Sequence, residues 1–320
     1  MSHLTREQRY TIASMLQNGY NQKEIALVIK KDKSVVSREI RRNADARSGV
    51  YRDDLAHRKY LKRQEYKAKP RTFTPEVEEY VRDRLRLKHS PEQIAGVAKK
   101  NGDKCVSHER IYQFIWQDKR KKGTLYLDLR NRGRRYKKRS VIYDKRGIIP
   151  NRTDISQRPP EVELRERFGD LEIDLIIGKN HKGAILTIND RATGFGKLRK
   201  LDGKDAQQLA TATIDCLMEW KPFLKTITSD NGKEFAAHEL VAKHLNIDFF
   251  FAKPYASWQR GSNENFNRLV RQYIPKKVDF DCIPTDYINF VEYQLNNRPR
   301  KRFKYESPMF MFNQKVAFST

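Results

Sequence analysis

The spacing of apolar residues predicts a mixed α/β region in the second half of the chain. Between residues 170 and 177, Leu171, Ile173 and Leu175 occupy alternate positions, as in a strand that buries one face. Further strands are predicted over 184–189, 196–201, 224–229 and 247–252, and helices over 205–220, 237–245 and 287–295. The order predicts a three-stranded meander followed by strands that alternate with helices.

The first half shows helical periodicity and helix-capping signals instead. Thr5 and Gln8 form a capping-box pattern, and helices are predicted from there toward Gly19, then over 21–30 and 34–42. The third helix turns small polar and basic side chains outward, as a recognition helix in a DNA major groove does. Its candidate DNA contacts are Ser34, Ser37, Arg38, Arg41 and Arg42. The alternative is a three-helix bundle with a charged face.

A second helix-turn-helix is predicted over 72–120. Helix starts are indicated at Thr74-Pro75-Glu76 and Ser90-Pro91-Glu92, because Pro is favoured in the first turn and an acid beside the helix N-terminus is stabilising. The candidate DNA contacts on its last helix are Ser107, His108 and Arg110.

Charge changes the picture most. Residues 1–150 carry +21 of the formal net charge of +26, which is typical of a nucleic-acid-binding region. A basic surface kept for solubility is the alternative. The densest run of basic residues predicts a linker that becomes ordered on DNA. It contributes Arg132, Arg134, Arg135, Lys137 and Lys138 as candidate contacts.

These patterns divide the chain into five segments. The predicted domains are a helix-turn-helix domain over 1–50, a basic connector over 51–71, a second helix-turn-helix domain over 72–120, a basic linker over 121–160 and a catalytic domain over 161–320. The chain contains no apolar run of about 18 residues and no apolar signal-peptide core. Its three scattered cysteines favour free thiols over a disulfide framework or a zinc site. We therefore expect a cytoplasmic protein.

Three carboxylates are candidates for catalysis. Asp174 interrupts an apolar strand, where a carboxylate is costly unless it is paired or binds a cation. Asp230 follows a predicted strand and precedes an Asn-Gly turn. Glu264 begins a helix whose apolar face contains Phe266 and Leu269. Carboxylate oxygens suit Mg²⁺ or Mn²⁺, and two such ions can activate one oxygen and stabilise a leaving oxygen in phosphoryl transfer.

The strings around these acids resemble the insertion-sequence-30 family of bacterial DDE transposases. They are 177–179 (IGK), 229–235 (SDNGKEF), 258–265 (WQRGSNEN) and 295–300 (LNNRPR). The resemblance implies that Asp174, Asp230 and Glu264 are the catalytic triad and hold two Mg²⁺ ions, for which Mn²⁺ can substitute. The family places Gly before the first acid, whereas this chain has Ile173, so Asp170 and Glu172 remain alternatives for that position.

The resemblance also implies a fold class and a function. The expected class is α+β multidomain: helical DNA-binding modules precede a ribonuclease-H-like catalytic domain with a mixed five-stranded sheet flanked by helices. Candidate DNA contacts near the acids are Lys179, Lys233, Trp258, Arg260 and Arg268. For Trp258, a position in the core is favoured over a platform for base stacking.

The expected activity is DNA transposition. The helical modules bind terminal inverted repeats as a homodimer or higher oligomer on DNA, and the acids catalyse metal-dependent cleavage and strand transfer, with a circular intermediate implied by the family. The alternatives are a ribonuclease-H-like nuclease and a sequence-specific repressor with an inactive catalytic domain.

Overall fold

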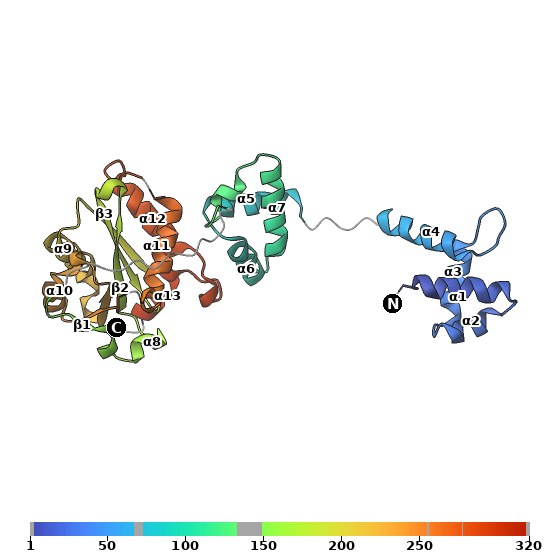
Figure 1. The fold of residues 1–320 in the computed structure, drawn as a ribbon, viewed down its shortest axis with the longest axis horizontal. Coiled ribbons are helices and arrows are strands. Elements are labelled where there is room, and N and C mark those ends of the chain that lie inside the picture. The colour runs from blue at the N-terminus through green and yellow to red at the C-terminus, as the bar shows by residue number, and fades with distance from the viewer. Residues whose placement is uncertain (1–2, 67–72, 133–148, 255, 277, 318–320) are drawn as a thin grey trace. The chain divides into compact units, whose positions relative to one another are not determined.

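The computed structural model describes residues 3–66, 73–132, 149–254, 256–276 and 278–317 (Figure 1). By internal contacts the chain divides into two compact units, residues 1–71 and residues 72–320. Cys105, Cys216 and Cys282 are free thiols. No helix among the described residues is both long enough and apolar enough to cross a membrane.

The first unit is a four-helix domain. Its helices are α1 (Arg6–Gln17), α2 (Gln22–Val28), α3 (Lys33–Asn43) and α4 (Asp53–Tyr66). Thr5 forms the expected capping box with Gln8, and Ile12, Ile25 and Val36 are fully buried where the three predicted helices meet. Ala56 of α4 belongs to the same core. Much of the predicted connector over 51–71 therefore folds as part of this domain.

The second unit begins with another helical module. It contains α5 (Pro75–Arg86), α6 (Pro91–Asn101), α7 (His108–Arg120) and the short 3₁₀ helix η1 (Leu125–Asp128). Thr74 and Ser90 cap α5 and α6, as their sequence patterns predicted. Leu85, Ile94 and Ile111 are fully buried between the helices.

The sheet of the second unit has six strands in the order β1-β6-β5-β2-β3-β4. They are β1 (Thr153–Asp154), β2 (Asp170–Ile177), β3 (Ala184–Asp190), β4 (Gly196–Leu201), β5 (Thr226–Ser229) and β6 (Asp248–Phe251). Strands β2, β3 and β4 form the predicted antiparallel meander, and β5, β6 and β1 continue the sheet in parallel. The predicted number of five strands is wrong by one: the two-residue β1 lies in the segment expected to be linker.

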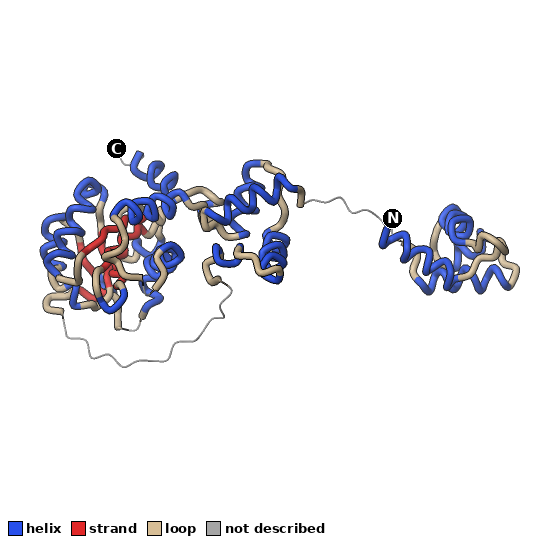
Figure 2. Tube along the Cα trace, turned by 90° about the horizontal axis from the view of Figure 1, so that it is seen from above, coloured by secondary structure: helices blue, strands red, loops and turns tan. Residues whose placement is uncertain are grey.

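Helices cover both faces of this sheet (Figures 1 and 2). Helices α9 (Ala206–Leu217) and α10 (His238–Leu245) cover one face, and α11 (Gly261–Tyr273) and α12 (Thr285–Asn297) cover the other. The alternation along β2 sends Leu171 and Ile173 into the first core and Ile176 into the second. Asp174 therefore faces α11. The fold confirms the predicted class of helical modules followed by an α/β domain with a mixed sheet.

Two further helices complete the domain. The short α8 (Glu161–Leu164) precedes β2, and α13 (Pro308–Ala317) ends the described chain. Phe312 of α13 packs against Phe195 and Trp220, with ring centroids 4.5 and 5.2 Å apart respectively. No sequence pattern had predicted α13.

The second helical module packs against the segment that follows α12. Arg298 donates from Nε to Gln93 Oε1 at 3.0 Å, and Gln93 donates from Nε2 to the carbonyl of Pro299 at 2.5 Å. The ring of Tyr305 lies so close to α6 that a Cβ on Gly96 would be 2.0 Å from Tyr305 Cζ. The module is thus held to the α/β domain by contacts that span about two hundred residues of sequence.

We expect this packing to weaken in acid through His89. Burial, followed by the positive charges of Arg298, Arg84 and Arg300, lowers the pKa of His89 from 6.5 to about 3. The folded chain therefore binds fewer protons than the unfolded chain below pH 6.5, so stability is lost as pH falls. Relative to His89→Leu, the free energy of unfolding of the parent should fall by roughly 2 kcal/mol between pH 7 and pH 5.

Urea unfolding followed by tryptophan fluorescence measures this difference, because all three tryptophans lie in the second unit. Comparing parent and variant at each pH cancels the contributions of other titrating groups. An unfolding free-energy difference that stays constant between pH 7 and pH 5 would show that His89 is not held neutral.

Candidate active site

The sheet register brings two of the three predicted acids together. Strands β2 and β5 pair in parallel with Asp170 opposite Thr226 and Glu172 opposite Thr228. The same register, extended by two residue pairs, places Asp174 beside Asp230, the residue that follows β5. Arg260 joins them: its Nη1 lies 3.5 Å from Asp174 Oδ2 and its Nη2 lies 3.5 Å from Asp230 Oδ2.

Asp174 is partly open to solvent and has defined partners. Its Oδ1 accepts from the backbone N–H of Leu175 and its Oδ2 accepts from Asn267 Nδ2, both at 2.9 Å. Burial raises the pKa of Asp174 to about 6, although Arg260 opposes the rise and Asp230 adds to it. A carboxylate with this burial and a like-charged neighbour is favoured in its ionised form by a bound cation. Asn267 was not singled out from the sequence, since an Asn on a helix carries no distinctive signal.

Asp230 is held by the turn that follows β5. Its Oδ1 accepts from the backbone N–H of Gly232 at 3.0 Å, closing an Asx turn. The next residue, Asn231, donates from Nδ2 to the carbonyl of Ala252 at 2.5 Å and accepts from Arg152 Nη1 at 2.5 Å. The Asn-Gly pair thus fixes the chain where the carboxylate emerges from the sheet.

Glu264 does not join the other two acids in this structure. It lies in the first turn of α11, and its Oε1 accepts from Arg268 Nη2 of the same helix at 2.7 Å. Asn267, one turn further along α11, is the residue that reaches Asp174. Across the described ranges, no three Asp, Glu, His or Cys side chains are grouped as metal ligands.

The two alternative acids of β2 have internal partners. Asp170 is 1% exposed and bonds Arg167 Nε at 2.7 Å and Thr226 Oγ1 at 2.8 Å. Glu172 is fully buried and accepts from Arg191 Nη1 at 2.5 Å and from the backbone N–H of Asn263 at 2.8 Å. Both carboxylates are accounted for by contacts that hold the domain together, whereas Asp174 faces the candidate site.

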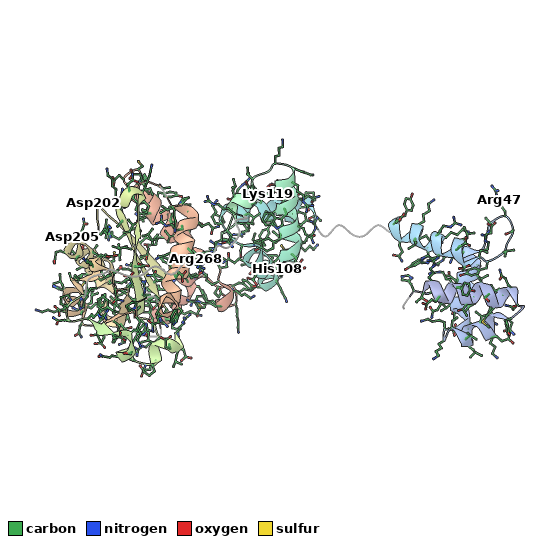
Figure 3. The ribbon with its side chains drawn as sticks, in the orientation of Figure 1. Arg47, His108, Lys119, Asp202, Asp205 and Arg268 are labelled. Atoms are coloured by element: carbon green, nitrogen blue, oxygen red, sulfur yellow. The ribbon has the colours of Figure 1, made fainter. Side chains whose placement is uncertain are left out.

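The cationic candidates near the acids differ in availability. Lys179 and Lys233 are exposed. Arg268, labelled in Figure 3, lies on α11 and donates to Glu264 of the same helix. Arg260 is mostly buried between the two aspartates, so it serves first as their counter-ion. The preference for Trp258 in the core is wrong: its side chain is 76% exposed in the short 3₁₀ helix η6 (Ser257–Arg260) that leads into α11.

The candidate DNA contacts of the first unit all lie on the outside of α3. Ser34, Ser37, Arg38, Arg41 and Arg42 are exposed. Arg38 turns back along the helix and donates to the carbonyl and the hydroxyl of Ser34 at 3.0 and 3.1 Å. The inner side of α3 is fixed by Glu39, which pairs with the buried Arg9 of α1 at 2.8 Å.

In the second module, fewer of the candidate side chains are free to contact DNA than the sequence predicted. Ser107 caps α7 by accepting from the backbone N–H of Arg110, and the Arg110 guanidinium lies 5.1 Å from the ring centroid of Phe73. His108 is exposed at the start of α7 (Figure 3). Arg132 donates to the carbonyl of Gln272 on α11 at 3.2 Å. The candidates Arg134, Arg135, Lys137 and Lys138 lie outside the described residues.

Comparison with known proteins identifies the family. Residues 1–43 match a family model described as a helix-turn-helix domain. The chain is 53% identical to the transposase for insertion sequence element IS4351 of Bacteroides fragilis, over 99% of each chain. It is 30% identical to transposase InsI for IS30C of Escherichia coli K12, over 100% of this chain and 85% of that one.

Two further similarities were found. The transposase for insertion sequence element IS1086 of Cupriavidus metallidurans is 32% identical, over 98% of this chain and 95% of that one. The catalytic core domain of BIV integrase matches 47% of this chain and 97% of that one at 17% identity and a TM-score of 0.39, too low to carry an argument. The full-length matches are decisive, and the chain belongs to the IS30 family of insertion-sequence transposases.

Proposed function

We propose that this protein moves an insertion sequence by metal-dependent cleavage and transfer of DNA strands. The observation that carries the proposal is the pair Asp174, within β2, and Asp230, at the end of β5, joined through one guanidinium in a chain of a transposase family. Terminal inverted repeats are the proposed binding sites of the helical modules, and the protein acts as a homodimer or higher oligomer on DNA. The family resemblance adds a circular intermediate.

The donor set suits a hard divalent cation. Asp174 and Asp230 place carboxylate oxygens around one shared positive charge, that of Arg260, and oxygen ligands are those that Mg²⁺ and Mn²⁺ prefer. Asp174, Asp230 and Glu264 would hold two Mg²⁺ ions. When bound, such ions lower the pKa of an attacking water or 3′-hydroxyl and stabilise the leaving oxygen.

The chain's own residues orient this site. Asn267 and the backbone N–H of Leu175 fix the two oxygens of Asp174, while the turn at Gly232 fixes Asp230. Arg268 holds the side chain of Glu264 on the exposed side of α11. Lys179 and Lys233 add positive charge that attracts the phosphodiester. No covalent link between protein and DNA is required by this arrangement.

A supercoiled plasmid that carries the element's inverted repeats tests the function. With purified protein and Mg²⁺, we expect joined element ends as a product. A nuclease would degrade the plasmid without joining, and a repressor with an inactive catalytic domain would bind the repeats and leave the DNA intact. Either of these two results would replace the proposal.

Loss of either outward arginine of α3 should weaken recognition of the repeat. We expect Arg38→Ala or Arg41→Ala to cost ~1–3 kcal/mol of specific binding, because a bidentate contact to a base edge is lost. The measurement is the ratio of affinities for repeat and scrambled DNA. Arg199→Ala, which removes an exposed arginine of β4, is the charge-matched control. If both α3 variants keep the parent's ratio, α3 is not the recognition helix.

A further inference from the structure

A strongly basic cavity lies where the second helical module, the first turns of α11 and the segment after α12 meet. Its volume is about 480 Å³, within the usual range of ligand pockets. Six cationic side chains line it: Arg130, Arg165, Arg298, Arg300, Lys301 and Arg302. The only acid in its lining is Glu92, which is paired with Lys301 at 2.6 Å.

Two of these arginines, Arg298 and Arg300, have neutral hydrogen-bond partners. Arg298, only 3% exposed, donates to the side-chain oxygens of Gln93 and Gln272 at 3.0 and 2.8 Å. Arg300 donates to the carbonyl of Leu295 at 2.9 Å. Neither forms an ion pair with any acid that the structure describes. Buried charge is costly without an opposite charge nearby, so this cluster of arginines lacks a counter-ion.

The lowered pKa values of two arginines agree with the lack of a counter-ion in the cavity. Burial, with the neighbouring arginines Arg298, Arg302 and Arg130, lowers the pKa of Arg300 to about 9. Burial likewise lowers the pKa of Arg298 to about 10. Positive charges therefore repel one another across the cavity, and an anion between them would remove the repulsion.

A buried hydroxyl group in the cavity wall also indicates a hydrogen-bonding ligand. The buried hydroxyl of Ser262 has no hydrogen-bond partner among the described residues. Ser262 lines the cavity from the first turn of α11, a thirteen-residue helix without a side-chain cap. Hydroxyl groups at helix N-termini donate readily to phosphate oxygens, and the helix dipole favours negative charge there.

We propose that this cavity binds a backbone phosphate of the DNA strand that enters the catalytic site. Ser262 lies two residues before Glu264, and Arg130 bonds Asn265 Oδ1 of the same helix at 2.9 Å, so the phosphate would be held beside the first turn of α11, which carries Glu264. Residues of the helical module and the catalytic domain would contact one phosphate together. The inference rests on the proposed function for the identity of the polyanion.

The test measures DNA binding by the full chain in EDTA, because DNA is not cleaved there during the binding measurement. Removing one phosphate contact should reduce the slope of log K against log salt by about 0.9. We expect Arg300→Gln to show this change and to bind about tenfold more weakly at 0.1 M salt. Arg199→Gln, the same charge change on β4, should match the parent.

A neutral variant separates hydrogen bonding from charge. Ser262→Ala loses no partner within the chain, so it should keep the parent's stability and salt slope but bind several-fold more weakly. A second probe is inorganic phosphate, which should raise the melting temperature of the parent more than chloride does at equal ionic strength, and that of Arg300→Gln less.

The outcomes are distinct. The proposal would be overturned if Arg300→Gln had the same salt slope and DNA affinity as the parent. It would also be overturned if Ser262→Ala bound DNA as tightly as the parent. Stabilisation by inorganic phosphate with an unchanged DNA slope would show a site for a free anion and would also overturn it. If Arg300→Gln fails to fold, the affinity of Ser262→Ala decides. A reduced slope in a protein that joins no ends would contradict the proposed function and leave the phosphate site standing.

Discussion

Replacing Asp174 with Asn should abolish strand cleavage and joining while leaving repeat binding and the fold intact. The substitution keeps the shape of the side chain and removes the negative charge that holds a hard divalent cation. Loss of that cation removes several kcal/mol of transition-state stabilisation, or roughly three orders of magnitude or more in rate.

The surroundings of Asp174 tolerate the amide. Its new NH₂ group would face Asn267, whose Oδ1 is buried without a partner, so rotation of the Asn267 amide supplies an acceptor. End cleavage with Mg²⁺ and with Mn²⁺ is the measurement, with repeat binding and thermal melting as controls. Cleavage at the parental rate would remove Asp174 from the site.

Replacing Glu172 with Gln should instead destabilise the second unit. Glu172 is fully buried and forms an ion pair at 2.5 Å with Arg191, which is itself 1% exposed. Arg191 would keep only Glu163, whose side chain is largely exposed, as a counter-ion, and breaking a buried ion pair costs up to about 3–5 kcal/mol. The loss appears as a lower urea midpoint in tryptophan fluorescence.

The same arginine provides a matched control. Glu163 also pairs with Arg191, at 2.8 Å, but its side chain is largely exposed. Glu163 also pairs with the buried Arg158, so Glu163→Gln should cost less than Glu172→Gln but more than the loss of a fully exposed pair. If Glu172→Gln keeps the parental stability but loses cleavage, Glu172 is the first catalytic acid and Asp174 is not.

Local patterns predicted the elements that position the site. Alternation from Leu171 to Ile177 identified β2 and placed Asp174 on its other face, and the helix-start residues Thr74 and Ser90 are caps in the structure. Such features depend on residues within a few positions of one another. Local sequence therefore carries enough information to predict them.

Features that depend on distant residues were not predictable in the same way. The packing of Tyr305 on Gly96 and the bond from Arg298 to Gln93 join segments about two hundred residues apart. The exposure of Trp258 also escaped prediction, because large aromatic residues are usually buried and only the tertiary structure shows that nothing covers this one. The basic cavity arises from such long-range packing.

Strand transfer is the most direct test of the proposed chemistry. A labelled duplex that ends in the terminal repeat with a free 3′-hydroxyl is incubated with the protein, Mg²⁺ and a supercoiled target plasmid. We predict that the label becomes covalently joined to the plasmid, and that joining is lost in EDTA and in Asp230→Asn. A parent protein that only shortens the labelled strand by hydrolysis, or leaves it unchanged, would contradict the assignment of Asp174, Asp230 and Glu264 to DNA strand transfer.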